Sequence, residues 1–199
     1  MPADSAPFNL TNHFLIAMPS LQGEPFSRSV VYLCEHNERG ALGIVINKPS
    51  DIKLKGLFDK VELPLLREDL INTPVFHGGP LQTDRGFVLH EPIFAAAEKP
   101  EESVYAATMT IPGGLEMTTS RDVLEAISTG AGPLKLLVSL GYSAWGQGQL
   151  ESELGENSWL TVDADTKVIF DTPVAERYER ALQLLGLQSW MLSSEAGHA

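Results

Sequence analysis

Three side chains that can take part in chemistry stand within four positions of this 199-residue chain: the thiol of Cys34, the imidazole of His36 and the amide of Asn37. A functional thiol needs a lowered pKa, which a neighbouring imidazole can provide. Residues two apart in a strand point to the same face, so His36 lies beside Cys34 if the strand continues past Glu35. A lone cysteine after an apolar run is, however, more often a small core residue. We therefore favour a core position for Cys34 and keep a thiol-dependent enzyme or redox sensor as the alternative.

Two glycine-containing segments approach the pattern of a serine hydrolase without completing it. A nucleophile elbow has the form G-x-S-x-G because the strained turn around the serine needs small residues, and beside Ser143 the second glycine position is occupied by Trp145. The segment from His77 to Pro80 has two adjacent glycines, as an oxyanion loop does, but Pro80 has no backbone N–H to donate. We therefore expect a protein that is not an enzyme.

The histidines outside the Cys34 segment do not form a metal-binding pattern. His13, His77 and His90 are far apart in the sequence, and no pair has the short spacing of a zinc-binding helix. A single cysteine cannot build a thiolate site. We therefore expect neither a metal nor another cofactor.

Polar and glycine-rich turns at the ends of several apolar strands are the basis of our main hypothesis. If these turns lie near one another, their polar groups converge on an apolar-lined cleft, as in most ligand sites. Asparagines in such turns more often hydrogen-bond the turn backbone, which is the competing interpretation. The candidate cleft residues are His13, His36, Asn37, Asn47, Gly78, Gly79, Tyr142 and Trp145. We predict a non-catalytic protein with a regulatory role that binds a small ligand or a protein partner there.

Short strands must position these residues. The apolar runs Val30–Cys34 and Leu42–Ile46 flank a polar turn, which is typical of a buried β-hairpin. Similar runs predict further strands at Phe14–Ala17, Gly86–His90, Val104–Ile111, Leu134–Leu140, Trp159–Val162 and Lys167–Phe170, and a strand from Val75 that ends in a tight turn at Gly78-Gly79-Pro80. Strands that follow one another in hairpins, without a regular β-α-β alternation, indicate an α+β fold.

Helices are expected in four places between or after these strands. They are Ile52–Phe58, Thr119–Gly130, Leu150–Gly155 and a last helix that begins at Thr172. In the last helix Thr172 suits the N-cap and Pro173 the first helical position. Tyr178 and Leu182 then form its buried side, and Arg177 faces water.

Length, composition and charge limit the class of protein. With 199 residues, of which 43% are hydrophobic, we expect one domain at 10–188, preceded by a flexible arm at 1–9 and followed by a polar tail at 189–199. The formal charge of −12 disfavours nucleic acid and anionic membranes as partners. No apolar run reaches the about 18 residues of a membrane span. The single cysteine and a polar, acidic N-terminus indicate a cytoplasmic protein.

Several separate blocks of the sequence carry a family resemblance through their order and spacing. They are His13–Pro19, Glu35–Asn37, Gly43–Pro49, Gly78–Pro80, Asp84–His90, Ser120–Asp122, Leu140–Trp145 and Gln149–Leu154. Together these blocks resemble the YqgE/AlgH family of small bacterial proteins, over most of the chain. The resemblance implies an α+β fold in which a bent, largely antiparallel sheet forms a pseudo-barrel with helices packed outside, in a bacterial cytosolic protein.

The resemblance adds an alternative function but no site. One member of the family is described as a regulator of alginate synthesis, which makes transcriptional regulation a further alternative. The sequence contains no helix-turn-helix pattern and no basic stripe, so this alternative depends on the family label alone. The family has no agreed catalytic residues, and the resemblance therefore assigns none here.

Overall fold

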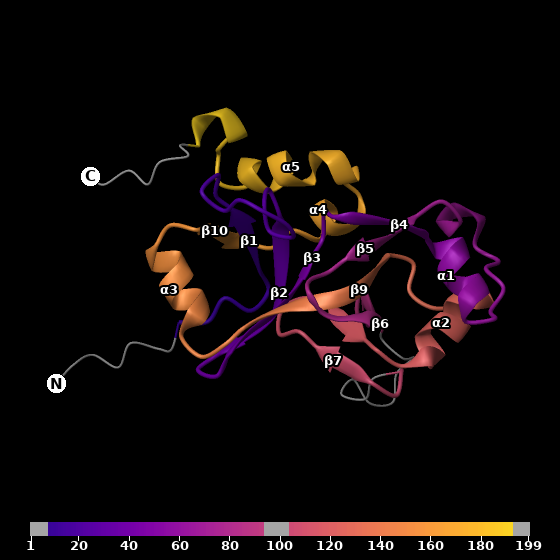
Figure 1. Cartoon of the computed structure of the whole chain (residues 1–199). Coiled ribbons are helices and arrows are strands. Elements are labelled where there is room, and N and C mark those ends of the chain that lie inside the picture. The colour runs from indigo at the N-terminus through magenta and orange to yellow at the C-terminus, as the bar shows by residue number, and fades with distance from the viewer. Residues whose placement is uncertain (1–7, 94–103, 193–199) are drawn as a thin grey trace.

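A single curled sheet organises this protein. The computed structural model describes residues 8–93 and 104–192. Within these residues the main path of the sheet runs β10-β1-β2-β3-β9-β6-β8-β7, and β5 joins β9 with β4 at its outer side. All pairs are antiparallel except β5 with β9. Helices flank the sheet (Figure 1), so the predicted α+β fold with a bent, largely antiparallel sheet is confirmed, in the form of a half-barrel.

The elements are short, and most lie where the apolar runs indicate. The strands are β1 His13–Ala17, β2 Val30–Asn37, β3 Gly40–Val45, β4 Pro49–Lys53, β5 Pro74–His77, β6 Leu81–His90, β7 Thr108–Thr110, β8 Glu116–Thr118, β9 Leu136–Trp145 and β10 Trp159–Asp163. The α-helices are α1 Leu54–Lys60, α2 Arg121–Ser128, α3 Gln149–Gly155, α4 Thr166–Phe170 and α5 Arg177–Gln183. Short 3-10 turns η1 Glu68–Leu70, η2 Val174–Glu176 and η3 Ser189–Met191 complete the set. No helix in the described ranges is both long and apolar enough to cross a membrane.

Three apolar clusters fix how the helices cover the sheet. Side chains alternate along β2, so Tyr32 enters a cluster closed by α4 and α5, whereas Val31 faces the opposite side, where α3 packs. A third cluster, which includes Phe58 and Val88, lies between α1, α2 and the strands β6 and β9. In Figure 1, α5 crosses one end of the sheet and α3 lies at the opposite side from α1 and α2. The helices α3, α4 and α5 therefore cover one part of the sheet, and α1 and α2 cover another.

A bulge interrupts the β2–β3 hairpin at Cys34. Leu33 pairs with Gly43, and the next paired residue, Glu35, lies opposite Leu42. One extra residue in β2 reverses the alternation of side chains beyond it. Cys34 belongs to the cluster with Tyr32, while His36 pairs with Ala41 of the cluster beneath α3. The prediction that Cys34 and His36 share a face is therefore wrong.

The segment Lys167–Phe170 is helical, not the predicted strand. Asp165 occupies the N-cap of α4 and its side chain accepts a hydrogen bond from the backbone N–H of Lys167 at 2.9 Å. Val168 and Ile169 are both buried in the main cluster. A four-residue apolar run fits a strand or one helical turn equally well, and here the N-cap decides.

The last helix begins later than predicted, and its first residue is buried. Thr172 and Pro173 precede the 3-10 turn η2, so α5 starts at Arg177. Arg177 is only 7% exposed, because its guanidinium donates to the carbonyl oxygens of Ile46 and Thr172 at 2.6 and 3.0 Å. The expectation that Arg177 faces water is wrong, whereas Tyr178 and Leu182 are buried as predicted.

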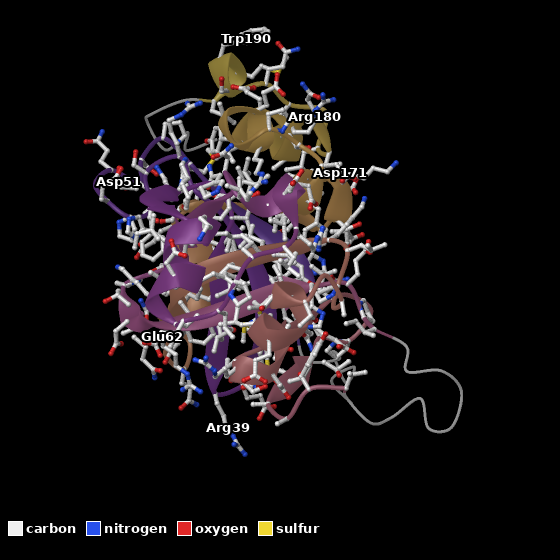
Figure 2. All side chains as sticks on the ribbon, turned by 90° about the vertical axis from the view of Figure 1, so that its right-hand side faces the viewer. Arg39, Asp51, Glu62, Asp171, Arg180 and Trp190 are labelled. Atoms are coloured by element: carbon white, nitrogen blue, oxygen red, sulfur yellow. The ribbon has the colours of Figure 1, made fainter. Side chains whose placement is uncertain are left out.

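Smaller differences concern the chain between β6 and α2 and the C-terminal end. Of the predicted strand Val104–Ile111 only β7 forms, and residues 94–103 before it lie outside the described residues. The predicted polar tail begins with η3, where Trp190 is 75% exposed and projects from the end of the molecule (Figure 2). Residues 193–199 lie outside the described residues, as do 1–7 of the predicted arm.

Candidate functional site

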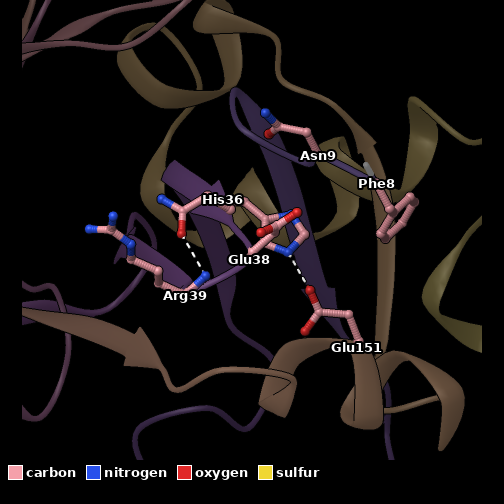
Figure 3. Close-up of a pocket in the computed structure, with 7 residues that line it drawn as sticks. Phe8, Asn9, His36, Glu38, Arg39 and Glu151 are labelled. Atoms are coloured by element: carbon pink, nitrogen blue, oxygen red, sulfur yellow. Dashed lines mark hydrogen bonds and ion pairs between the residues drawn. The ribbon is translucent and has the colours of Figure 1, made fainter. Parts of the chain in front are cut away.

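The tip of the β2–β3 hairpin borders a recess of about 540 Å³ (Figure 3). It is lined by Phe8, Asn9, His36, Asn37, Glu38, Arg39 and Glu151. A neighbouring recess of about 280 Å³ shares Asn37 and Arg39 and also contacts Tyr142 and Trp145. Arg39 projects from the hairpin tip into solvent (Figure 2). Four of the predicted cleft residues therefore lie around this tip.

His36 is held by two hydrogen bonds at the base of the tip recess. Its Nδ1 accepts from the backbone N–H of Leu10 at 2.9 Å, so this nitrogen carries no proton. Its Nε2–H donates to Oε1 of Glu151 at 2.7 Å, and the imidazole is 0% exposed. The bond from His36 lowers the pKa of the Glu151 carboxyl below its ordinary value. Because both ring nitrogens have partners, His36 joins the N-terminal segment to α3 and is not a free general base.

Cys34 is inaccessible and unfavourably placed for thiol chemistry. It is 2% exposed, and its Sγ faces the carbonyl oxygen of Tyr32 at 3.7 Å. Burial raises the pKa of the thiol far above its ordinary value, because a thiolate loses its hydration there. His36 lies across the sheet and cannot stabilise a thiolate. The burial of this thiol therefore argues against the alternative of an enzyme or redox sensor that uses Cys34.

His13 and Asn47 lie away from both recesses and satisfy local partners. Nδ1 of His13 lies 3.1 Å from the carbonyl oxygen of Thr11, and Nε2 lies 2.9 Å from Oδ1 of Asp163. Asn47 accepts from the backbone N–H of Val30 and donates to the carbonyl oxygen of Arg28, both at 2.9 Å. For Asn47 the competing interpretation, a residue that hydrogen-bonds a turn, agrees with these contacts.

Gly78 and Gly79 allow the chain after β5 to approach β9. A Cβ on Gly78 would lie 1.9 Å from Oγ of Ser139, and a Cβ on Gly79, whose φ is +156°, would lie 2.2 Å from the carbonyl of Tyr142. Ser143 is 0% exposed and donates to the carbonyl oxygen of Gly78 at 3.1 Å, so it is no nucleophile. Neither glycine lines the recesses at the hairpin tip. Within the described residues, the hairpin turn and the glycine turn therefore do not share either of these two recesses.

A third pocket, of about 250 Å³, lies between α1, α2 and the strands β6 and β9. We call it the α1–α2 pocket. Its floor consists of apolar side chains of the third cluster: Leu57, Val88, Leu124, Val138 and Leu140. The exposed and half-buried polar residues that line it are Asp84, Arg85, Thr119, Ser120 and Arg121, and the fully buried Thr118 also borders it. The pocket thus combines an apolar floor with two guanidinium groups.

The two arginines of the α1–α2 pocket are anchored at its rim. Nη1 and Nη2 of Arg85 donate to Oε1 of Gln82 and Oγ1 of Thr119 over long distances of 3.3 and 3.4 Å. Arg121 donates from Nη2 to the carbonyl oxygen of Val61 at 2.8 Å and from Nε to Glu125 at 3.3 Å. Both side chains remain exposed, so each keeps N–H donors for a ligand.

The sequence patterns did not indicate these pocket residues as a site. Arg85 and Thr119 are 34 positions apart, and only the pairing of β6 with β8 brings them together. The available signal was the family resemblance, because two of its blocks, Asp84–His90 and Ser120–Asp122, meet at this pocket. The first block mixes polar and apolar residues, and the second, Ser-Arg-Asp, is entirely polar, whereas core segments consist mainly of apolar residues.

Comparisons with known proteins agree with the resemblance. A family model described as AlgH-like matches residues 14–190. UPF0301 proteins of Variovorax paradoxus and Albidiferax ferrireducens are each 76% identical to this chain over 199 residues, with both chains covered completely. The solution structure of the AlgH protein from Pseudomonas aeruginosa superposes with a TM-score of 0.74 at 46% identity, covering 98% of this chain and 99% of that one. A crystal structure of a protein from Corynebacterium diphtheriae, 19% identical, shares the fold with a TM-score of 0.67 over 92% of this chain and 89% of that one.

Proposed function

The chain belongs to the AlgH-like family, and we propose that this member is a non-catalytic protein that binds a small amphipathic carboxylate in its α1–α2 pocket. One observation carries the proposal: the lining of this pocket combines apolar side chains of the third cluster with Arg85 and Arg121, its two cations. Binding without conversion of the ligand suits a regulatory role, and the unpaired Cys34 supports a cytoplasmic location.

The chemistry of the pocket favours a carboxylate that carries a short apolar chain. Arginine presents planar N–H donors that match a carboxylate, and such charge-assisted hydrogen bonds are stronger than neutral ones. The floor offers side chains such as Val138 and Leu140 to an apolar chain. A volume of about 250 Å³ lies below the range of drug-sized pockets, so the ligand has few heavy atoms.

Two hydroxyls near the pocket, those of Thr118 and Ser120, are held in structural hydrogen bonds, which supports binding without catalysis. Oγ1 of Thr118 lies 2.8 Å from Nε2 of His90, and Nδ1–H of His90 donates to the carbonyl oxygen of Glu91. A hydroxyl beside an oriented imidazole resembles an activated nucleophile. Both side chains are 0% exposed, however, so a ligand in the pocket does not reach this oxygen. Oγ of Ser120 donates to Asp122, which keeps that hydroxyl in a structural bond.

Hexanoate, acetate and hexanol are suitable probes for this proposal. In two-dimensional amide NMR titrations we expect hexanoate to shift residues around Val88 and Leu124, and to bind about tenfold or more tightly than hexanol, which lacks the charge, or acetate, which lacks the chain. Arg85→Gln and Arg121→Gln should each weaken hexanoate binding. Arg180→Gln removes the same charge from the exposed face of α5 and is the matched control.

Two results would contradict the proposal. One is equal affinity for hexanoate and hexanol, which would show that the guanidinium groups do not take part. The other is undiminished hexanoate binding in both Arg85→Gln and Arg121→Gln. Shifts confined to another part of the molecule would likewise exclude this pocket as the binding site.

A second candidate function is protein binding at the hairpin-tip recess. The specific observation is Phe8, which is 61% exposed and packs edge-on against His36 at a centroid distance of 6.0 Å. Glu38 and Glu151 lie in the same recess, so it suits a basic peptide that contributes an apolar side chain. The net charge of −12 argues against nucleic acid as the partner. Phe8→Ser should abolish binding of such a peptide. Phe26→Ser alters an interior aromatic cluster instead, so it should lower the free energy of unfolding without removing a contact to the peptide.

A further inference from the structure

Arg177 is a buried cation without a carboxylate partner among the described residues. Its guanidinium donates from Nε to the carbonyl oxygen of Thr172 and from Nη1 to that of Ile46, and lies 5.1 Å from the centroid of the Phe76 ring. It is 7% exposed, and burial lowers its pKa to about 10. A buried charge that faces only neutral groups is energetically unfavourable. Arg177 thus has no counter-ion within residues 8–93 and 104–192, although its guanidinium is buried.

The third nitrogen of Arg177 is free to bind a ligand. An arginine side chain has five N–H donors, and Nη2 makes no hydrogen bond to the described part of the chain. No fully buried side-chain nitrogen within that part lacks a partner, so Nη2 must reach accessible space. Arg177 lines a recess of about 280 Å³ between β5, the start of β9 and the α4–η2 segment. We call this the Arg177 recess.

The charges around the Arg177 recess leave one cation uncompensated. Two carboxylates line its rim, and each already faces a cation. Asp69 accepts from Arg67 at 2.7 Å, and that bond lowers the pKa of the Asp69 carboxyl. Both oxygens of Asp171 accept from Nζ of Lys135, at 2.9 and 2.8 Å. Among the described residues at this recess, Arg177 is the cation without an acidic partner, in a protein whose overall charge is −12.

We propose that the Arg177 recess binds a small oxyanion, whose oxygens accept hydrogen bonds from Nη2 of Arg177. The shared chemistry is a carboxylate or phosphate group with little apolar body, because the volume of about 280 Å³ leaves room for only a few heavy atoms. Phe76 and Val174 border the same space. This site is separate from the α1–α2 pocket: the two share no lining residue, so either proposal can fail alone.

The test is an amide NMR titration of the whole chain with inorganic phosphate and, in a second arm, with acetate. Potassium chloride at equal ionic strength is the control for screening. We expect saturable shifts at Phe76, Leu137 and Val174, and a shift of the Arg177 Nε–H resonance, with one of the two anions. If neither anion causes a saturable shift up to about 10 mM, binding of millimolar affinity is excluded and the proposal is overturned.

A matched pair of variants separates binding in the recess from general electrostatics. Val174→Glu places a carboxylate in the recess beside Arg177, where it competes with the anion, while Ala175→Glu adds the same charge at an exposed neighbour that does not line the recess. We expect Val174→Glu to weaken the anion about tenfold or more, the size of one charge-assisted hydrogen bond, and Ala175→Glu to have little effect. Equal weakening by both variants would overturn the proposal. If Val174→Glu does not fold, the Arg177 Nε–H shift in the unaltered chain decides the question.

Discussion

Glu153 holds two buried tryptophans, and its replacement gives a quantitative test of how the hairpin region is stabilised. Oε2 of Glu153 accepts hydrogen bonds from Nε1 of Trp145 at 2.8 Å and from Nε1 of Trp159 at 2.9 Å. The two indoles are 5% and 4% exposed and pack with Phe26 in one aromatic cluster. One carboxylate on α3 therefore satisfies both indole N–H groups and joins β9 to β10.

The expected cost follows from the number and type of these bonds. A hydrogen bond to a charged group contributes about 1.5–3 kcal/mol. Glu153 is half-buried, so the lower end of that range applies to each bond, and Glu153→Ala should lower the free energy of unfolding by about 3 kcal/mol. In a chain of this size that corresponds to a fall in Tm of about 6–12 °C. Glu153→Gln should cost about half as much, because the amide oxygen still accepts but carries no charge.

Urea unfolding followed by circular dichroism and tryptophan fluorescence measures these differences. Glu156→Ala is the control, since Glu156 is exposed at the end of the same helix and its side chain makes no hydrogen bond to another described residue. If Glu153→Ala unfolds at the same urea concentration as Glu156→Ala, the carboxylate does not stabilise the indoles and the reasoning is refuted. A larger loss for Glu153→Gln than for Glu153→Ala would also contradict it.

Three further predictions follow from the candidate residues. Gly79→Ala should lower the free energy of unfolding by about 3 kcal/mol or more in urea titrations. The new Cβ would collide with the carbonyl of Tyr142, and residue 79 has a positive φ that favours glycine. An unchanged free energy of unfolding would refute the close approach. Cys34 should resist a thiol reagent in the native protein and react only on unfolding, and rapid native labelling would show that the thiol is accessible. The His36 bond lowers the pKa of Glu151 below 4.5, so its contribution to stability is present above that pH and is lost as the pH falls through the folded-state pKa. Glu151→Gln should therefore flatten the acid limb of a stability–pH curve, and an unchanged limb would argue against this contribution.

Local patterns in the sequence were sufficient for elements whose apolar residues repeat clearly. The hairpin of β2 and β3, the strand β1 and the helix α3 lie close to the predicted ranges, because alternation or helical spacing shows which face is apolar. The run Lys167–Phe170 is too short to show either alternation or helical spacing, and it is helical because the side chain of Asp165 caps its N-terminus. Arg177 could not be recognised as buried, because its acceptors include Ile46, a distant residue.

The candidate sites show the same division between local and distant information. Residue patterns alone were sufficient to infer the α+β class, the family, the net negative charge and the polar residues at the hairpin tip. Which of these residues meet depends on the folded arrangement: one bulge at Cys34 separates it from His36, and the pairing of β6 with β8 brings Arg85 to Thr119. The physical reason is that a residue pattern specifies the apolar face of its own segment, whereas register and contacts between distant segments depend on packing of the whole sheet.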